Sequence, residues 1–276
     1  MSSFLKILGI SFLFVVPVAA EGEREFFEKS GARMTKDSEG RIIKIQLSGK
    51  PPMTVPEFQK LGKLTHLQQL ATNGPPAGDG GWGFLRDLKN LKQLTIWHGK
   101  EFSSLSPFCD LPIEGLTVGG CMGIRNLNKD EIRKQRDAVL TLRGLPNLQK
   151  LNLYHSPLTP DDSHLAHIAR EFPKLQDLKL DFAAPRGSET SISPQGLREL
   201  KKLPLKILTI ESTSTLTAEH MKAIAEIESL QSLLLDARRT DLDSAAVASL
   251  KEIRPGLEVV VAEAGSKAPP KQSLKN

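Results

Sequence analysis

The chain has 276 residues, of which 39% are hydrophobic and 25% charged; this composition is typical of a globular protein and excludes an intrinsically disordered one. The formal net charge of +5 is modest, and charges of both signs are mixed along the sequence. Because proteins that bind nucleic acid usually gather Lys and Arg on one face, this balance does not indicate nucleic acid as a partner. Aromatic residues make up only 5%, so aliphatic side chains have to form the core.

The N-terminal residues have the pattern of a secretory signal peptide. Lys6 supplies the positive start, residues 7–16 are apolar with two interruptions, and small residues up to Ala20 offer a cleavage site. A retained membrane anchor is the competing interpretation, but the apolar run is shorter than the roughly 20 residues that a spanning helix needs. We therefore expect residues 1–20 to be removed on export to the periplasm or the extracellular space, with no stable membrane insertion afterwards.

Residues 21–41 are predicted to form an N-terminal cap. The stretch Glu21–Glu28 is charged and contains two phenylalanines, which indicates a short helix with an apolar side. The turn-forming residues Asp37–Gly40 lie between two short extended runs, and this arrangement predicts a hairpin over Arg33–Ile45. Such a segment can cover apolar surface at the start of a stacked structure.

Residues 42–262 carry one pattern many times. In its clearest copy, Leu148-x-x-Leu151-x-Leu153, the last part alternates as a half-buried strand does. All the steps between copies but one lie close to the roughly 20–29 residues of leucine-rich repeats, and the chain resembles that family over nearly all of the mature protein. The second apolar position of the copies falls at residues 45, 70, 94, 116, 151, 178, 208, 233 and 260.

The resemblance implies an α/β solenoid, shaped as a horseshoe or an arch, with a parallel β-sheet on the concave side and helices on the convex side. Helix-like segments follow the predicted strands, in agreement with this fold. Hydroxyl or carboxylate residues that can cap a helix precede four of them, at Thr159, Ser193, Thr217 and Asp243. The predicted helices span residues 55–61, 84–88, 102–109, 161–172, 194–201, 218–227 and 244–253.

Two segments depart from the repeat. The longest step contains residues 125–142, which are rich in charge, with Ile132, Val139 and Leu140 as the expected apolar anchors. We interpret this segment as a lengthened convex helix with a solvated face, and a basic docking surface is the alternative. After Ala262 the composition changes to Gly, Ser, Pro and Lys, which predicts a disordered basic tail over residues 263–276.

Enzyme signatures are missing from the sequence. It contains no Gly-x-Ser-x-Gly elbow, no His-Glu-x-x-His motif and no phosphate loop ending in Gly-Lys-Ser/Thr. The glycine-rich stretch Gly78–Gly83 lacks the lysine of a phosphate loop, and we expect it to be a flexible loop between repeats. The sequence therefore predicts a protein that is not an enzyme and has no catalytic residues.

The cysteines and two of the histidines are candidates for covalent or metal chemistry. Two cysteines are too few for a disulfide framework, so Cys109 and Cys121 are expected to be buried thiols, although export permits a disulfide. His164 and His167 lie three apart on a predicted helix and could share a metal. A metal site needs three or four converging ligands. We expect both histidines on the surface beside the buried stripe, with no metal and no cofactor.

Side chains that alternate with the inward leucines are expected on the concave face. The position after each Leu-x-Leu pair contains Trp97 and the sole tyrosine, Tyr154, and each is followed by a histidine, His98 and His155. The repeat between them has small residues around Gly119. Two aromatic walls should therefore stand about 10 Å apart over a small-residue floor. The alternative to a binding slot is that the two aromatic side chains only cover apolar surface, or that the strand register is shifted by one residue here.

Further along the chain the same column contains the acids Asp181, Glu211 and Asp236. They are either ordinary solvated charges or an acidic surface that binds a cationic partner. The resemblance implies recognition through the concave sheet. The predicted function is thus a non-catalytic exported module that binds a protein or peptide; binding of a cell-envelope glycan at the Trp97/Tyr154 slot is the alternative. The predicted binding residues are Trp97, His98, Tyr154, His155, Asp181, Phe182, Glu211 and Asp236.

Overall fold

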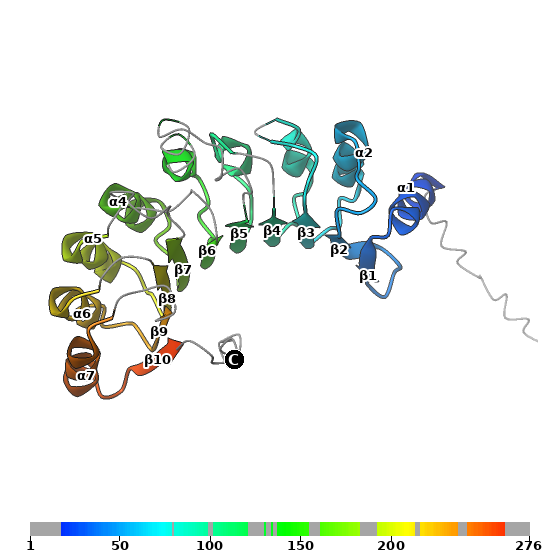
Figure 1. Ribbon diagram of the computed structural model, residues 1–276. Helices are drawn as coiled ribbons and strands as arrows, with labels where there is room; N and C mark the ends of the chain where they lie inside the picture. Colours follow the sequence, from blue (N-terminus) through cyan, green and yellow to red (C-terminus); the bar gives the residue numbers. More distant parts are fainter. Residues whose placement is uncertain are drawn as a thin grey trace, which may run out of the picture.

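The described residues form an arch in which one curved sheet lines the concave side and the helices lie on the convex side (Figure 1). The architecture is α/β, the sheet is not closed into a barrel, and it is compatible with the solenoid that the sequence predicts. In the computed structural model the described residues are 18–78, 80–98, 102–120, 130, 134, 137–154, 161–182, 192–212, 216–236 and 242–262.

Among the described residues the sheet contains ten strands in the order of the sequence, as a chain of consecutive repeats requires. The first pair is antiparallel and all later neighbours are parallel. The strands are β1 (Arg33–Lys36), β2 (Ile42–Leu47), β3 (Gln69–Asn73), β4 (Gln93–Trp97), β5 (Gly115–Gly119), β6 (Lys150–Tyr154), β7 (Asp177–Phe182), β8 (Ile207–Ser212), β9 (Ser232–Asp236) and β10 (Glu258–Ala262).

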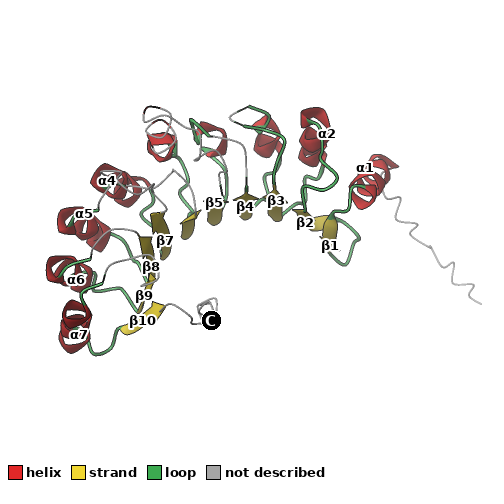
Figure 2. Ribbon diagram, viewed as in Figure 1, coloured by secondary structure: helices red, strands yellow, loops and turns green. Residues whose placement is uncertain are grey.

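The helical layer changes along the arch (Figure 2). Its first half consists mainly of short 3₁₀ turns, whereas longer α-helices follow the later strands. The α-helices are α1 (Val18–Lys29), α2 (Val55–Gln59), α4 (Asp162–Glu171), α5 (Pro194–Glu199), α6 (Ala218–Ala225) and α7 (Ser244–Ile253), and the 3₁₀ turns are η1 (Lys60–Lys63), η2 (Gly83–Asp87), η3 (Ser106–Phe108), η5 (Ala138–Thr141) and η6 (Leu200–Lys202).

One apolar residue of each parallel strand stacks directly on that of the next. Leu151 pairs in register with Leu116 and Leu178, and all three are at most 1% exposed. The predicted repeat positions are confirmed from residue 45 to residue 233. The last position is wrong by one residue, because Val259 rather than Val260 pairs with Leu233.

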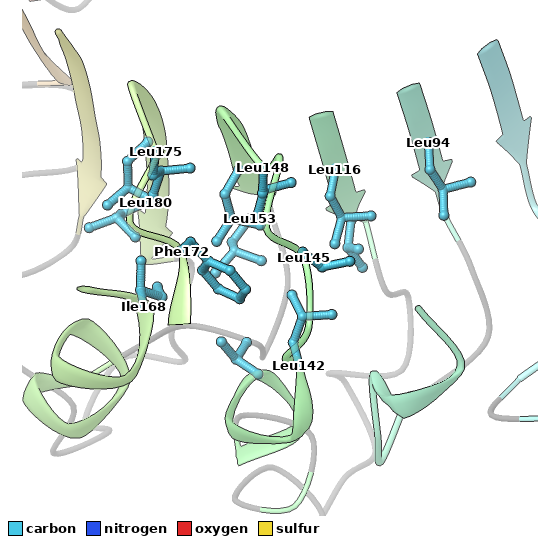
Figure 3. Packing of buried hydrophobic residues seen from close by; sticks show 14 of the residues in the cluster. Leu94, Leu116, Leu142, Leu145, Leu148, Leu153, Ile168, Phe172, Leu175 and Leu180 are labelled. Atoms are coloured by element: carbon cyan, nitrogen blue, oxygen red, sulfur yellow. The ribbon is translucent and has the colours of Figure 1, made fainter. Parts of the chain in front are cut away.

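The core lies between the sheet and the helices. Figure 3 shows Leu94 and Leu116 directed from their strands toward the helical layer. Helix α4 contributes Ile168, and the chain after it contributes Phe172; both are fully buried. The predicted aliphatic core is thus present, and each repeat adds one layer to it.

The predicted N-terminal hairpin is confirmed, since β1 and β2 pair on either side of the turn around Gly40. Helix α1 includes the predicted stretch Glu21–Glu28 and begins three residues earlier, at Val18. Its Phe27 is fully buried against the core. These residues therefore cover the first apolar layer, as a solenoid end requires.

Most of the predicted helix starts are observed. Ser193 and Asp243 accept backbone N–H groups at the starts of α5 and α7, and Thr217 is the N-cap of α6. The start predicted at Thr159 is wrong, because Asp161 caps α4 through the N–H of Ser163.

A capping box that was not anticipated begins α2. The Glu57 carboxylate accepts the backbone N–H and the hydroxyl of Thr54, while the Thr54 hydroxyl accepts the Glu57 N–H. Hydrogen bonds from the Thr54 backbone and side chain lower the pKa of Glu57. Such reciprocal bonds satisfy donors that the first helical turn leaves unpaired.

Two expectations for the loops need correction. In the charged segment 125–142, of which residues 130, 134 and 137–142 are described, Val139 is buried but Leu140 is 37% exposed. The predicted flexible loop Gly78–Gly83 is anchored by Trp82, which is 1% exposed and donates its indole N–H to the carbonyl of Gly78. The predicted tail lies outside the described residues.

No helix in the described part of the chain is long and apolar enough to span a membrane. The predicted signal peptide up to residue 17 lies outside that part.

Truncating a stacked leucine should destabilise the arch. We expect Leu151→Ala and Leu178→Ala each to lower the free energy of unfolding by about 2–5 kcal/mol, because each leaves a cavity between neighbouring repeats. Urea unfolding followed by circular dichroism measures the change. Gln149→Ala, at an exposed position just before β6, is the control and should change stability by less than about 0.5 kcal/mol. Losses below that value for both leucine variants would contradict the observed packing.

Candidate functional site

The concave ends of β4 and β5 form the first part of the candidate site. Trp97 ends β4 and pairs with Gly119 of β5, which pairs in turn with Tyr154 of β6. The predicted alignment of the two aromatic residues across a glycine is therefore present in the backbone. Trp97 is half-buried rather than fully exposed. The side chain of Tyr154 and the whole of His155 lie outside the described residues.

The small-residue floor between the aromatic positions is not open. Gly115, Gly119 and Gly120 are all buried, and Thr117 is only 9% exposed. A Cβ atom added to Gly115 would lie within 2.0 Å of the Gln93 carboxamide. Gly115 thus allows the Gln93 side chain to fold over it, and the residues predicted as an open floor are buried.

His98 has a defined position at this edge of the sheet. Its Nδ1 lies 2.7 Å from Oδ1 of Asn73, and its backbone N–H donates to the carbonyl of Gly119 at 2.8 Å. The residue has a φ of 49°, which is uncommon outside glycine. Its ring lies against Gly120, where an added Cβ would approach Cδ2 to 2.7 Å. The imidazole is exposed, but Asn73 and Gly120 fix its position. It can form a hydrogen bond with a ligand on the concave face.

Ion pairs connect neighbouring strands in the middle of the face. Lys150 of β6 binds Asp177 of β7, and Lys179 of β7 binds Glu211 of β8, each at 2.5 Å. Glu211 is therefore not an isolated acidic group in a track, as its column in the sequence suggested. Opposite charges on adjacent strands attract each other across the roughly 4.8 Å that separates the strands.

The concave side of β8 and β9 is buried, which the sequence did not predict. Asp236, expected among solvated acids, is 1% exposed. Ile207 and Leu234 are each 7% exposed although they alternate with the inward leucines. The side chains of Asp181 and Phe182 lie outside the described residues.

The predicted surface position of the two α4 histidines is wrong. His164 is fully buried and His167 is 7% exposed. Nε2 of His167 lies 2.8 Å from the carbonyl oxygen of Leu142, and Nδ1 of His164 lies 2.6 Å from Oδ1 of Asp161. They are buried because backbone and carboxylate groups of their own and the preceding repeat supply hydrogen bonds.

A third histidine repeats this arrangement two repeats later. His220, 9% exposed, accepts the backbone N–H of Thr217 at Nδ1, so Nε2 carries the proton and donates to the carbonyl of Ile192 at 2.9 Å. Each of these histidines thus has a structural role. Among the residues that the structure describes, no three His, Cys, Asp or Glu side chains are placed to hold a metal ion.

Cys109 is a free thiol that is partly exposed rather than buried. Its Sγ–H donates to the carbonyl of Thr141 at 3.2 Å. Cys121 lies outside the described residues. The local contact of Cys109 is therefore with η5 of the next repeat.

Comparison with known proteins gives little information about the function of this surface. No family model and no curated protein matches the chain. Among solved structures, the crystal structure of PEPR1-AtPEP1 is similar at 14% sequence identity and a TM-score of 0.32, covering 83% of this chain and 36% of that one. The chain thus spans little more than a third of that protein, and a likeness this distant carries no conclusion about function.

Removing the His220 side chain should destabilise the helical layer. We expect His220→Ala to lower the free energy of unfolding by about 2 kcal/mol, because the carbonyl of Ile192 loses its donor inside the protein. His220→Gln should lose less, since a glutamine at this helix position can restore the contact with the Thr217 N–H. Urea unfolding measures both. Glu219→Ala, on the exposed side of the same helix, is the control; an equal effect of this variant would contradict the role of His220.

The contact between His98 and Gly120 can be tested by a double-mutant cycle. Gly120→Ala should destabilise the protein by about 1–3 kcal/mol, because the backbone φ of 68° is unfavourable for alanine and the new methyl group meets the His98 ring. His98→Gly should remove only the part of this cost that comes from the clash between the new methyl group and the His98 ring. A coupling energy of zero between the two changes, measured by urea unfolding, would show that the ring and the glycine do not interact.

Proposed function

We propose that the protein is an exported, non-catalytic recognition module that binds a protein or peptide through the concave face of its sheet. The observation that carries this proposal is the row of outward side chains from Gln93 to Glu211, which includes the half-buried Trp97. The stacked leucines beneath hold these side chains at regular spacing. A surface that is rigid before binding loses little entropy on binding.

The chemistry of the face suits a polypeptide partner. Trp97 offers apolar area, and tryptophan is frequent among residues that dominate binding energy. Asn73 and His98 offer hydrogen-bonding groups beside it, and Gln93 offers one at the start of the same strand. The partly exposed pair of Lys150 and Asp177 can exchange its mutual contact for charged groups of a partner. Mixed polar, charged and aromatic groups over several strands match the varied surface of a peptide chain.

No observation favours a glycan over a peptide. A sugar ring between two aromatic walls would need the open floor that the sequence suggested, and the residues around Gly119 are buried. Glycan binding is therefore an outcome that the experiment has to distinguish, rather than a second proposal. Export itself rests on the sequence of residues 1–20.

The proposal predicts that binding depends on the aromatic residues of the concave face. Partners can be captured from cell-envelope extract on immobilised mature protein, with a glycan array in parallel. We expect Trp97→Ala and Tyr154→Ala each to weaken binding of a captured partner by about 2 kcal/mol, measured by calorimetry, because large buried anchors carry most interface energy. Lys222→Ala, on the exposed side of α6, should leave the affinity unchanged.

Two results would contradict the proposal. One is a captured partner whose affinity is indifferent to both aromatic substitutions but falls with Lys222→Ala, which would place the interface on the convex side. The other is binding to the glycan array without any captured polypeptide.

A further inference from the structure

His98 has a backbone conformation that glycine has at the same position of the neighbouring repeats. The residue directly after the strand is Gly74 for β3, His98 for β4 and Gly120 for β5, with φ of 60°, 49° and 68°. The three positions are equivalent, because the N–H of Gly74 donates to the carbonyl of Trp97 and the N–H of His98 to that of Gly119. A residue with a side chain is strained in this region, whereas glycine is not. The imidazole is therefore present at a cost in stability.

This conformation decides where the imidazole lies. Side chains alternate along a strand, so the residue directly after the outward Trp97 would otherwise point toward the core. Instead, the ring of His98 contacts the side chain of Asn73, which is the outward residue of β3 that pairs with Trp97. The imidazole is exposed there. The strained backbone thus places a second side chain next to Trp97 at the concave edge.

The contact with Asn73 determines which ring nitrogen carries the proton. Nδ1 of His98 lies 2.7 Å from Oδ1 of Asn73. An amide oxygen can only accept, so Nδ1 donates and Nε2 of the neutral ring is an acceptor. Gly120 leaves space on this side, since a Cβ atom there would lie 3.1 Å from Nε2. Within the part of the chain that the structure describes, no group donates to Nε2.

The charges around His98 indicate what kind of donor fits. The outward positions of β2, β3, β4 and β5 contain one charged residue, Lys44, and no acid. A cationic donor would find no carboxylate on these strands to compensate for its lost hydration. The described acids of the face, Asp177 and Glu211, belong to β7 and β8 and are paired with lysines. A neutral donor is therefore favoured, and a polypeptide carries one such donor on every residue except proline.

We propose that Nε2 of His98 accepts a main-chain N–H of an extended segment of the partner, while an apolar side chain next to that N–H packs on Trp97. This inference deepens the proposed function and rests on it. Trp97 and His98 are consecutive, and residues of an extended chain follow each other at about 3.4 Å, so one or two residues of the partner meet both side chains. His98 is then a specificity-determining residue, because a proline has no N–H to donate at the same position.

Peptides with single N-methylated amides test the hydrogen bond. The probes are synthetic peptides selected from a random library on the immobilised mature protein, and those whose affinity falls with Trp97→Ala are kept. Methylation of one particular amide should weaken binding to the wild-type protein about tenfold, because it removes the donor. His98→Gly should bind the unmodified peptide about tenfold more weakly, and the same methylation should then cost less than about twofold more. Methylation at other positions is the control and should have equal effects on both proteins.

Stability measurements separate this role from a structural one. His98→Gly should leave the midpoint of urea unfolding unchanged or raise it, because glycine adopts this φ in the neighbouring repeats without strain. A residue that only joined two repeats would lower the midpoint and would show no coupling to a single amide of the peptide. If His98→Gly does not fold, His98→Asn decides, since asparagine tolerates a positive φ but is too short to place an acceptor at the position of Nε2.

The outcomes distinguish this inference from the proposed function. Peptides that depend on Trp97 but bind the folded His98 variant as tightly as the wild type would overturn the inference alone. So would methylation effects that are the same in both proteins at every amide. If no selected peptide depends on Trp97, the proposed function fails and the role of His98 fails with it.

Discussion

The in-register stacking of apolar residues from Ile45 to Val259 is the constraint on which the rest of the structure depends. Each strand of the parallel sheet has to place its inward leucines directly beside those of its neighbours, since a shift by one residue would turn them toward solvent. The outward residues are then fixed as well. The concave face is therefore a consequence of the core, and its side chains can vary without altering the fold.

Buried polar groups provide the second kind of connection between repeats. His167 and His220 each reach from a helix to a backbone carbonyl of the preceding repeat. Arg254, at the end of α7, donates to four carbonyl oxygens around the end of α6, those of Ala225, Ile227, Glu228 and Leu230. Leucine stacking is similar between any two repeats, whereas these bonds have specific partners. They therefore help to fix the position of each helix on the next.

The fold could be predicted from the sequence because the signal repeats. Strand positions follow from the Leu-x-Leu spacing, and Ser193 and Asp243 mark helix starts locally. The last strand was misplaced because its copy has one residue between Leu257 and Val259 where the other copies have two. The buried histidines could not be predicted in the same way, since their partners, such as the Ile192 carbonyl, are remote in sequence.

The candidate site was less predictable for a related reason. The sequence places Trp97 and Tyr154 in one column correctly, because the column follows from the strand register. Whether the space between them is open depends on side-chain conformations, and the ring of His98 lies against Gly120 there. The burial of Asp236, which is 1% exposed, likewise does not follow from its place in the column. Periodicity determines which face a residue lies on, but it does not determine what else covers that face.

The order of strands in the sheet has a consequence for self-association. In the described part of the chain β1 and β10 each have one neighbour, so each presents backbone N–H and C=O groups along a free edge. The edge at β1 is four residues long and includes two basic residues, which discourage pairing with another chain. The edge at β10 consists of consecutive valines between Glu258 and Ala262. Concentrated protein is therefore expected to associate at this edge first, by adding a strand of a second molecule to the sheet.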